Sequence, residues 1–149
     1  MNKSWIANGF TAANALFGGL SIMMSISGEY HVAAICILIA MAADAFDGRV
    51  ARALGTAGPM GVELDSLSDD ISFGVAAGAL MYSYQLRELG AFGFIPCALL
   101  GAFCAFRLAR FNVKVTSVHG YFEGLPCPTV GVITVSYTHL RAHETPEHL

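Results

Sequence analysis

The sequence predicts an all-α membrane protein, a bundle of helices that crosses a bilayer several times. Of its 149 residues, 55% are hydrophobic and 13% are charged, whereas a typical soluble domain is about 25% charged. The apolar residues come in blocks separated by short polar connections, as in polytopic membrane proteins. The sequence has no basic tail and no aromatic-basic stripe, so we expect no nucleic-acid partner.

Five segments free of Asp, Glu, Lys and Arg mark the expected helices: 4–28, 30–43, 71–86, 89–106 and 124–140. A helix needs about 20 residues to cross the hydrocarbon core, and the first segment alone is long enough. The second reaches that length only by continuing through Asp44 and Asp47 toward Arg52. The third reaches it only by starting near Asp65. The turn between them is marked by Gly55, Gly58 and Pro59.

The basic residues predict how the bundle is oriented. If the five helices alternate in direction, one side receives Lys3, Arg49, Arg52, Arg107, Arg110 and Lys114. Apart from Arg141 in the tail, only Arg87 falls on the other side. Cytoplasmic loops carry the excess of Lys and Arg. We therefore expect a multi-pass protein of the cell membrane, with the acidic stretch at residues 44–70 facing the cytoplasm and short outer loops at 27–31 and 85–90.

The last fourteen residues, "SYTHLRAHETPEHL" at 136–149, differ from the rest, since they hold three of the five histidines. We interpret them as a non-native read-through tail, with residues 1–135 forming an incomplete membrane domain whose fifth helix is cut short. The alternative is a genuine short polar tail, because chain termini are commonly polar.

The acidic stretch has the spacing of two helix faces. Asp44 and Asp47 are three apart and Asp65 and Asp69 four apart, so each pair shares one face. Four carboxylates this close need positive charge between them. Oxygen ligands suit hard cations such as Mg²⁺, Mn²⁺ or Ca²⁺. Two such ions can neutralise a diphosphate and support in-line displacement.

Small and basic residues follow the first pair of acids. Gly48 and Ala51 fall on the face of Asp44 and Asp47, where a missing or short side chain lets a ligand approach the backbone. Arg52 lies about one and a half turns beyond Asp47, within reach of a phosphate oxygen.

Together these residues form the pattern Asp44-x2-Asp47-Gly48-x2-Ala51-Arg52-x8-Gly61-x3-Asp65-x3-Asp69. The pattern resembles the signature of the CDP-alcohol phosphotransferase family at every fixed position. The resemblance implies an integral membrane enzyme, usually of six helices and often a homodimer. It also implies transfer of a substituted phosphoryl group from a CDP-linked donor to an alcohol, with release of CMP. The metal it implies is Mg²⁺ or Mn²⁺, bound as two ions.

The resemblance also assigns roles to the signature residues. It implies that Asp44, Asp47 and Asp65 are metal ligands, and that Asp69 is a further ligand or the catalytic base. It places the CDP site at Gly48, Ala51, Arg52 and Gly61. Asp70 and Arg49 lie outside the signature, and we interpret them as a solvated helix-start residue and a cytoplasmic anchor.

Three other stretches resemble the phosphatidylserine synthases of bacteria and archaea within this family. They are "IANGFTAANALFGGLSI" with Asn8, Thr11 and Asn14, "FRLARFN" at 106–112, and "YFEGLPCPTVG" at 121–131. Ala7 departs from the proline usual in the first. This resemblance implies CDP-diacylglycerol and L-serine as substrates, membrane lipid as the surroundings, and Thr11 and Asn14 among the CDP- and phosphate-binding residues.

Arg107 and Arg110 are three apart near the end of the fourth expected helix. Guanidinium groups match a lipid phosphate or the serine carboxylate bidentately, so both are candidates for acceptor or lipid binding. The alternative is that they are topological anchors, which are common at cytoplasmic helix ends.

The four cysteines, Cys36, Cys97, Cys104 and Cys127, lie scattered in apolar surroundings without a CxxC pair. We interpret them as small buried hydrophobic residues and not as zinc ligands or disulfides.

Three alternatives remain for function. The first is the same reaction with glycerol 3-phosphate or inositol as the acceptor. The second is a divalent-cation transporter, because intramembrane aspartates also mark ion pathways. The third is that the chain is inactive as a truncated fragment. The arginines beside the acids favour a phosphate substrate over ion transport.

Overall fold

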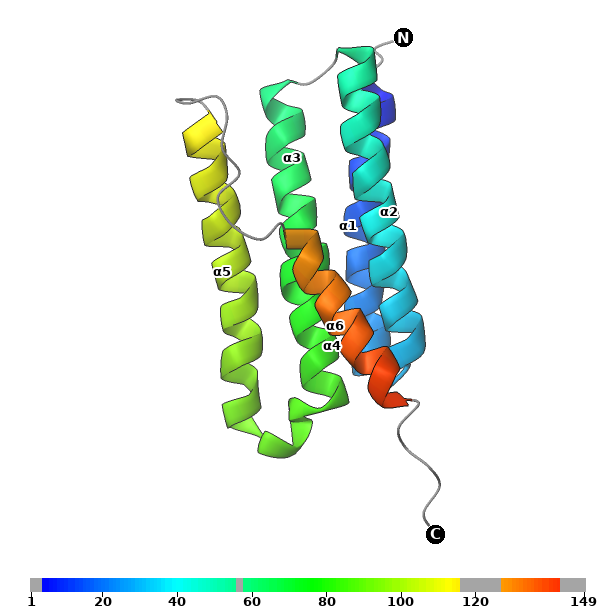
Figure 1. Ribbon diagram of the computed structural model, residues 1–149, viewed down its shortest axis with the longest axis vertical. Coiled ribbons are helices and arrows are strands. Elements are labelled where there is room, and N and C mark those ends of the chain that lie inside the picture. Colours follow the sequence, from blue (N-terminus) through cyan, green and yellow to red (C-terminus); the bar gives the residue numbers. More distant parts are fainter. Residues whose placement is uncertain (1–3, 56–57, 116–126, 143–149) are drawn as a thin grey trace.

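Long helices lie side by side and a last helix crosses them obliquely (Figure 1). The computed structural model describes residues 4–55, 58–115 and 127–142. The α-helices are α1 (Ser4–Ile26), α2 (Tyr30–Leu54), α3 (Pro59–Asp69), α4 (Ala76–Tyr84), α5 (Ala91–Val115) and α6 (Cys127–Ala142), with a π-helical turn η1 (Asp70–Val75) and a 3₁₀ turn η2 (Leu86–Leu89). Within those residues there is no strand, which confirms the predicted all-α class.

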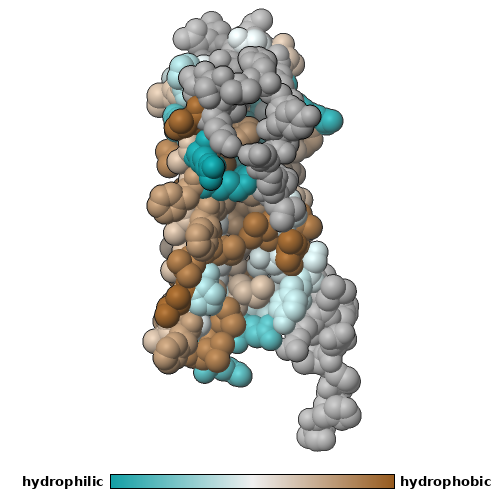
Figure 2. Space-filling model, turned by 60° about the vertical axis from the view of Figure 1, so that its left-hand side comes forward, coloured by the Kyte–Doolittle hydropathy of each residue, from teal (hydrophilic) through white to brown (hydrophobic). Residues whose placement is uncertain are grey.

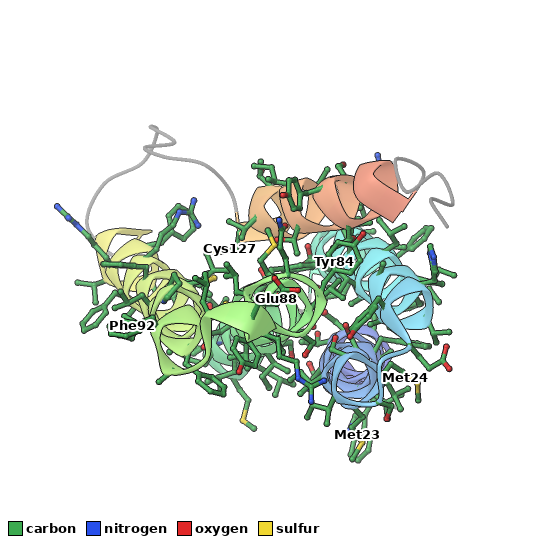
Figure 3. The ribbon with its side chains drawn as sticks, turned by 90° about the horizontal axis from the view of Figure 1, so that it is seen from below. Met23, Met24, Tyr84, Glu88, Phe92 and Cys127 are labelled. Atoms are coloured by element: carbon green, nitrogen blue, oxygen red, sulfur yellow. The ribbon has the colours of Figure 1, made fainter. Side chains whose placement is uncertain are left out.

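The surface of the bundle is that of a membrane protein. Within the described residues, three helices are long and apolar enough to span a bilayer, over Asn8–Ile26, Tyr30–Val50 and Ala91–Val113. On the face shown in Figure 2, hydrophobic residues cover the middle and hydrophilic residues gather above and below them. Large apolar side chains such as Met23 and Phe92 point away from the bundle (Figure 3), with exposed fractions of 65% and 79%.

The turn between α2 and α3 has the predicted residues. α2 continues past both of its aspartates and ends at Leu54, as expected. Gly55 has a φ of 62°, a left-handed conformation that glycine adopts without strain. α3 begins at Pro59, where a missing N–H is not needed. The predicted start near Asp65 was therefore wrong, because it took the apolar run and not this proline as the helix start.

The helices α3 and α4 follow each other as one continuous rod, joined by η1 (Figure 1). In η1 the N–H of Ala76 bonds to the carbonyl of Ile71, five residues back, which widens the helix by one residue. η1 lies at the centre of the bundle, and its Phe73 is fully buried. α6 crosses at Gly131, where a Cβ would come within 2.9 Å of the Phe73 ring.

The α1–α2 and α4–α5 turns lie at the end of the bundle opposite the α2–α3 turn (Figure 1). α1 and α2 are joined at Gly28 (φ 85°), and α4 and α5 through η2 and Gly90 (φ 55°). The two connections expected on the outer side therefore share one end. α6 runs without a break to Ala142, and residues 143–149 lie outside the described part, so the division at residue 135 stays a prediction.

Candidate active site

Three of the four signature aspartates meet between α2 and α3. Asp44 lies in the second half of α2, and Asp65 and Asp69 lie one turn apart on α3. Each of the three offers a carboxylate oxygen, and these oxygens all lie within 4.8 Å of one another. Asp69 is buried, with 8% of its surface exposed, and the other two are half-buried. Three of the four carboxylates that the spacing predicted to converge are thus grouped in the fold.

These carboxylates suit a divalent cation. Negative charges so close, and mostly shielded from water, repel one another strongly. Within the described part of the chain, Oδ1 of Asp65 is buried and has no hydrogen-bond partner, an arrangement that costs free energy unless a ligand satisfies the oxygen. All three donors are oxygens, which hard ions such as Mg²⁺ and Mn²⁺ prefer. The cluster therefore has the donors and the charge to hold a metal ion.

Two polar residues of α1 hold aspartates of the signature. The hydroxyl of Thr11 donates a hydrogen bond to Oδ2 of Asp47. Nδ2 of Asn14 donates to Oδ1 of Asp69 at 3.1 Å. Thr11 and Asn14 are both buried, with 3% and 0% of their surface exposed. Their observed partners are the acids, and a direct contact of either residue with phosphate stays a prediction.

Asp47 is buried on α2 with 5% of its surface exposed, but it does not belong to the group of three. Its Oδ2 accepts the hydrogen bond from Thr11, which holds the carboxylate toward α1. The metal-ligand role that the resemblance implied for Asp47 therefore stays a prediction, as does that of the other acids.

The small residues of the signature leave open space on the helices that carry the aspartate cluster. Gly61 lies in the first turn of α3, and a Cβ there would have only Oδ1 of Asn8 near it, at 4.0 Å. Gly48 is half-buried one residue after Asp47. Ala51 and Arg52 belong to the last turn of α2, but their side chains lie outside the described ones.

Ser72 is a site residue that the sequence did not single out. Its hydroxyl donates to the main-chain carbonyl of Asn14 at 2.9 Å, and its side chain is fully buried. It thereby fixes η1 against the segment of α1 that holds Asp69. The signal was available, since Asp65, Asp69 and Ser72 follow the i, i+4, i+7 spacing of one helix face.

The two arginines predicted for the acceptor lie on α5 in different surroundings. Arg107 is half-buried on α5, and its Nη1 donates to Sγ of Cys127 at 3.3 Å. Arg110 is exposed. Arg107 faces the start of α6 while Arg110 is exposed to the surroundings, and their acceptor-binding role stays a prediction.

The interpretation of Asp70 as a solvated helix-start residue was wrong. Asp70 lies in the middle of the α3–η1–α4 rod, and its Oδ1 is buried. A Cβ on Gly74 would approach that oxygen to 2.7 Å and Cβ of Cys104 to 3.1 Å, so the carboxylate points toward α5. The helix begins earlier than the apolar run, which places Asp70 inside the bundle.

The sequence was compared with protein families and with known proteins, and the matches agree with the family that the site residues resemble. The CDP-alcohol phosphatidyltransferase family profile matches residues 4–143. A CDP-diacylglycerol–serine O-phosphatidyltransferase of Helicobacter pylori is 38% identical over 129 residues, which are 86% of this chain and 54% of that protein. Its counterpart in Bacillus subtilis is 37% identical over 132 residues, 87% of this chain and 73% of that protein.

An archaetidylserine synthase of Methanothermobacter thermautotrophicus is 40% identical over 129 residues, 85% of this chain and 54% of that protein. The chain spans about half the length of the Helicobacter and Methanothermobacter relatives. No solved structure matches it significantly. The family profile covers nearly all of the chain, and three of the four signature acids meet in the fold, so the chain belongs to the CDP-alcohol phosphatidyltransferase family.

Proposed function

We propose that the protein is a metal-dependent phosphatidyltransferase that converts CDP-diacylglycerol and L-serine into phosphatidylserine and CMP. The observation that carries the proposal is the cluster of Asp44, Asp65 and Asp69, whose donor set fits a cation bound to a diphosphate. The names of the relatives, which contain serine or its lipid product, support serine as the acceptor.

The aspartates hold the metal, as one or two ions of Mg²⁺ or Mn²⁺. When bound, the metal neutralises the diphosphate and polarises the phosphorus–oxygen bond that breaks. Asp69 takes the proton of the serine hydroxyl, because it is the most enclosed member of the cluster and Asn14 orients its carboxylate. Asp47 completes the acidic lining from α2, held by Thr11.

The CDP moiety lies against the small residues of the signature. Gly61 leaves room above the first turn of α3, and Gly48 and Ala51 do the same on α2. Arg52 binds a phosphate oxygen, and Arg107 binds the serine carboxylate or the lipid phosphate. Catalysis rests on alignment of the hydroxyl with phosphorus and on charge neutralisation.

The membrane placement follows the chemistry of the two substrates. The acyl chains of the donor stay in the bilayer, while the diphosphate meets water-soluble serine at the end of the bundle that carries the α2–α3 turn. The excess of basic residues at that end supports a cytoplasmic active site in the cell membrane. We further propose a homodimer, as the family resemblance implies.

The test is CMP release from CDP-diacylglycerol in mixed micelles, with and without serine, in Mg²⁺ and in Mn²⁺. We expect serine-dependent release that falls at least about 1000-fold in Asp44→Asn and in Asp69→Asn. Glu63→Gln removes an exposed acid of the same helix outside the signature and should retain activity. Turnover with glycerol 3-phosphate or inositol but not with serine would show that the proposed acceptor is wrong. Full activity of Asp69→Asn would refute the role of Asp69 as the base.

A further inference from the structure

Two thiols beside the aspartate cluster lie nearly within bonding distance. Sγ of Cys104 on α5 and Sγ of Cys127, the first residue of α6, are 2.9 Å apart. Both residues are buried, with 7% and 3% of their surface exposed, and neither forms a disulfide. Bonded sulfurs lie about 2.05 Å apart, so the two atoms need to approach by about 0.9 Å. Figure 3 shows Cys127 at the inner side of α6.

The surroundings make the two thiols chemically unequal. Nη1 of Arg107 donates to Sγ of Cys127 at 3.3 Å, and a neighbouring positive charge favours the thiolate, which is the reactive form. The amino-terminal position of Cys127 on α6 acts in the same direction. Cys104 instead lies near the carboxylate of Asp70, because a Cβ on Gly74 would be 2.7 Å from Oδ1 of Asp70 and 3.1 Å from Cβ of Cys104.

We propose that Cys104 and Cys127 form a reversible oxidation site, at which a hydroperoxide converts the two thiols into a disulfide that ties α6 to α5. The Cys127 thiolate attacks the peroxide oxygen, the O–O bond breaks, and the alcohol leaves with one thiol proton. The Cys127 sulfenic acid is then attacked by the Cys104 thiol. The S–S bond forms and water leaves, so that two thiols and one hydroperoxide give one disulfide, one alcohol and one water.

The disulfide would change two features near the aspartates: the hydrogen-bond partner of Arg107 and the position of the start of α6. It converts the Cys127 sulfur to which Arg107 donates into a disulfide sulfur that cannot ionise, and it fixes the start of α6 against the face of α5 that contacts Asp70. The site consists of this chain's own residues, so it does not depend on the proposed function or on a bound metal.

The experiment treats the reduced full-length chain in detergent with one equivalent of tert-butyl hydroperoxide and then counts thiols after denaturation. We expect free thiols to fall from the four cysteines of the sequence to two. Peptide mass spectrometry should find Cys104 linked to Cys127, with Cys36 and Cys97 unmodified as controls within the same chain. A phosphine reductant should restore all four thiols, and a non-reducing gel should show a single-chain band.

Two variants test the assigned roles. In Cys104→Ser, Cys127 should accumulate as a sulfenic acid that dimedone captures; in Cys127→Ser, Cys104 should stay reduced over the same time. Circular dichroism and elution volume check that both variants fold. If either variant does not fold, the peptide map of the unaltered chain alone tests for the Cys104–Cys127 disulfide. Four remaining thiols, a link through Cys36 or Cys97, or a link between chains would overturn the proposal. Rapid oxidation of Cys104 in Cys127→Ser would overturn the order of attack.

Discussion

The two ends of the bundle are held together by different means. At the end near the α2–α3 turn, buried polar side chains connect α1 to the acids, through the Thr11–Asp47 and Asn14–Asp69 hydrogen bonds. At the opposite end, α4 and α5 approach through glycine: a Cβ on Gly78 would lie 2.8 Å from the carbonyl oxygen of Cys97.

The opposite end also has an open space, but this one is lined by apolar side chains and not by acids. A groove of about 580 Å³ lies between α4 and α5, lined mostly by apolar side chains including Val75, Ala79, Phe94 and Ala98. Close backbone approach and dispersion contacts hold α4 and α5 together in lipid, while between α1 and α2 the buried hydroxyl of Ser21 donates to the carbonyl of Ala33 at 2.9 Å. The difference indicates that the acidic end is arranged for binding at a cost in stability, and that the opposite end supplies the stability.

The largest effect should come from removing one charge of the cluster. Asp65→Asn takes away a carboxylate whose Oδ1 has no partner among the described residues. We expect Mn²⁺ affinity to fall at least about 100-fold, while the metal-free chain becomes more stable by about 1 kcal/mol because repulsion is relieved. Mn²⁺ titration by electron paramagnetic resonance and thermal unfolding in detergent measure the two effects.

The matched control for that variant removes the same charge at the other end. Glu88 in η2 is exposed, so Glu88→Gln should change neither Mn²⁺ affinity nor unfolding temperature. Equal losses of affinity in both variants would mean that the cluster does not bind the metal, and a less stable Asp65→Asn chain would contradict the assignment of strain to the acidic end.

The next largest effect should be structural and confined to the opposite end. In Gly78→Ala the new methyl group meets a backbone carbonyl, which cannot move out of the way as a side chain would. We expect unfolding to become easier by about 1 to 3 kcal/mol, with Mn²⁺ affinity unchanged. Gly19→Ala is the control, since nothing lies within 4 Å of a Cβ there, and it should leave stability equal or slightly higher. A loss of metal affinity in Gly78→Ala would show that the two ends are coupled.

A smaller effect on both properties should follow from Thr11→Val, which keeps the shape of the side chain and removes its hydroxyl. The carboxylate of Asp47 then loses its hydrogen bond from α1. We expect a loss of about 1 kcal/mol in stability and of about tenfold in Mn²⁺ affinity. Thr11→Ser keeps the hydroxyl and should retain both. If Thr11→Val matched the unaltered chain in a Mn²⁺ titration, the hydrogen bond would have no part in holding the site.

The sequence predicted those features that depend on spacing along one helix or on a turn residue. The pairing of Asp65 with Asp69, the passage of α2 through Asp44 and the reversal at Gly55 are all of this kind. The inward direction of Asp70 and the contact of Cys104 with Cys127 are not, because they depend on how α5 and α6 approach η1. Such approaches are set by packing between segments far apart in the chain, and a single sequence contains no local signal for them.

The smallest expected effect concerns a polar contact at the acidic end that involves no acid. Nδ2 of Asn112 on α5 donates to Oγ of Ser66 on α3 at 3.0 Å, next to Asp65 in sequence but on a helix face half exposed to the surroundings. If polar contacts at this end serve mainly the aspartates, this one should contribute little. A double-mutant cycle of Ser66→Ala and Asn112→Ala should give a coupling of about 0.6 kcal/mol, the usual value for hydrogen bonds between membrane helices. Mn²⁺ affinity should stay the same in all three variants. A coupling above about 2 kcal/mol would mean that hydrogen bonds hold the acidic end as firmly as glycine packing holds the other, and the proposed division between a binding end and a stabilising end would no longer stand.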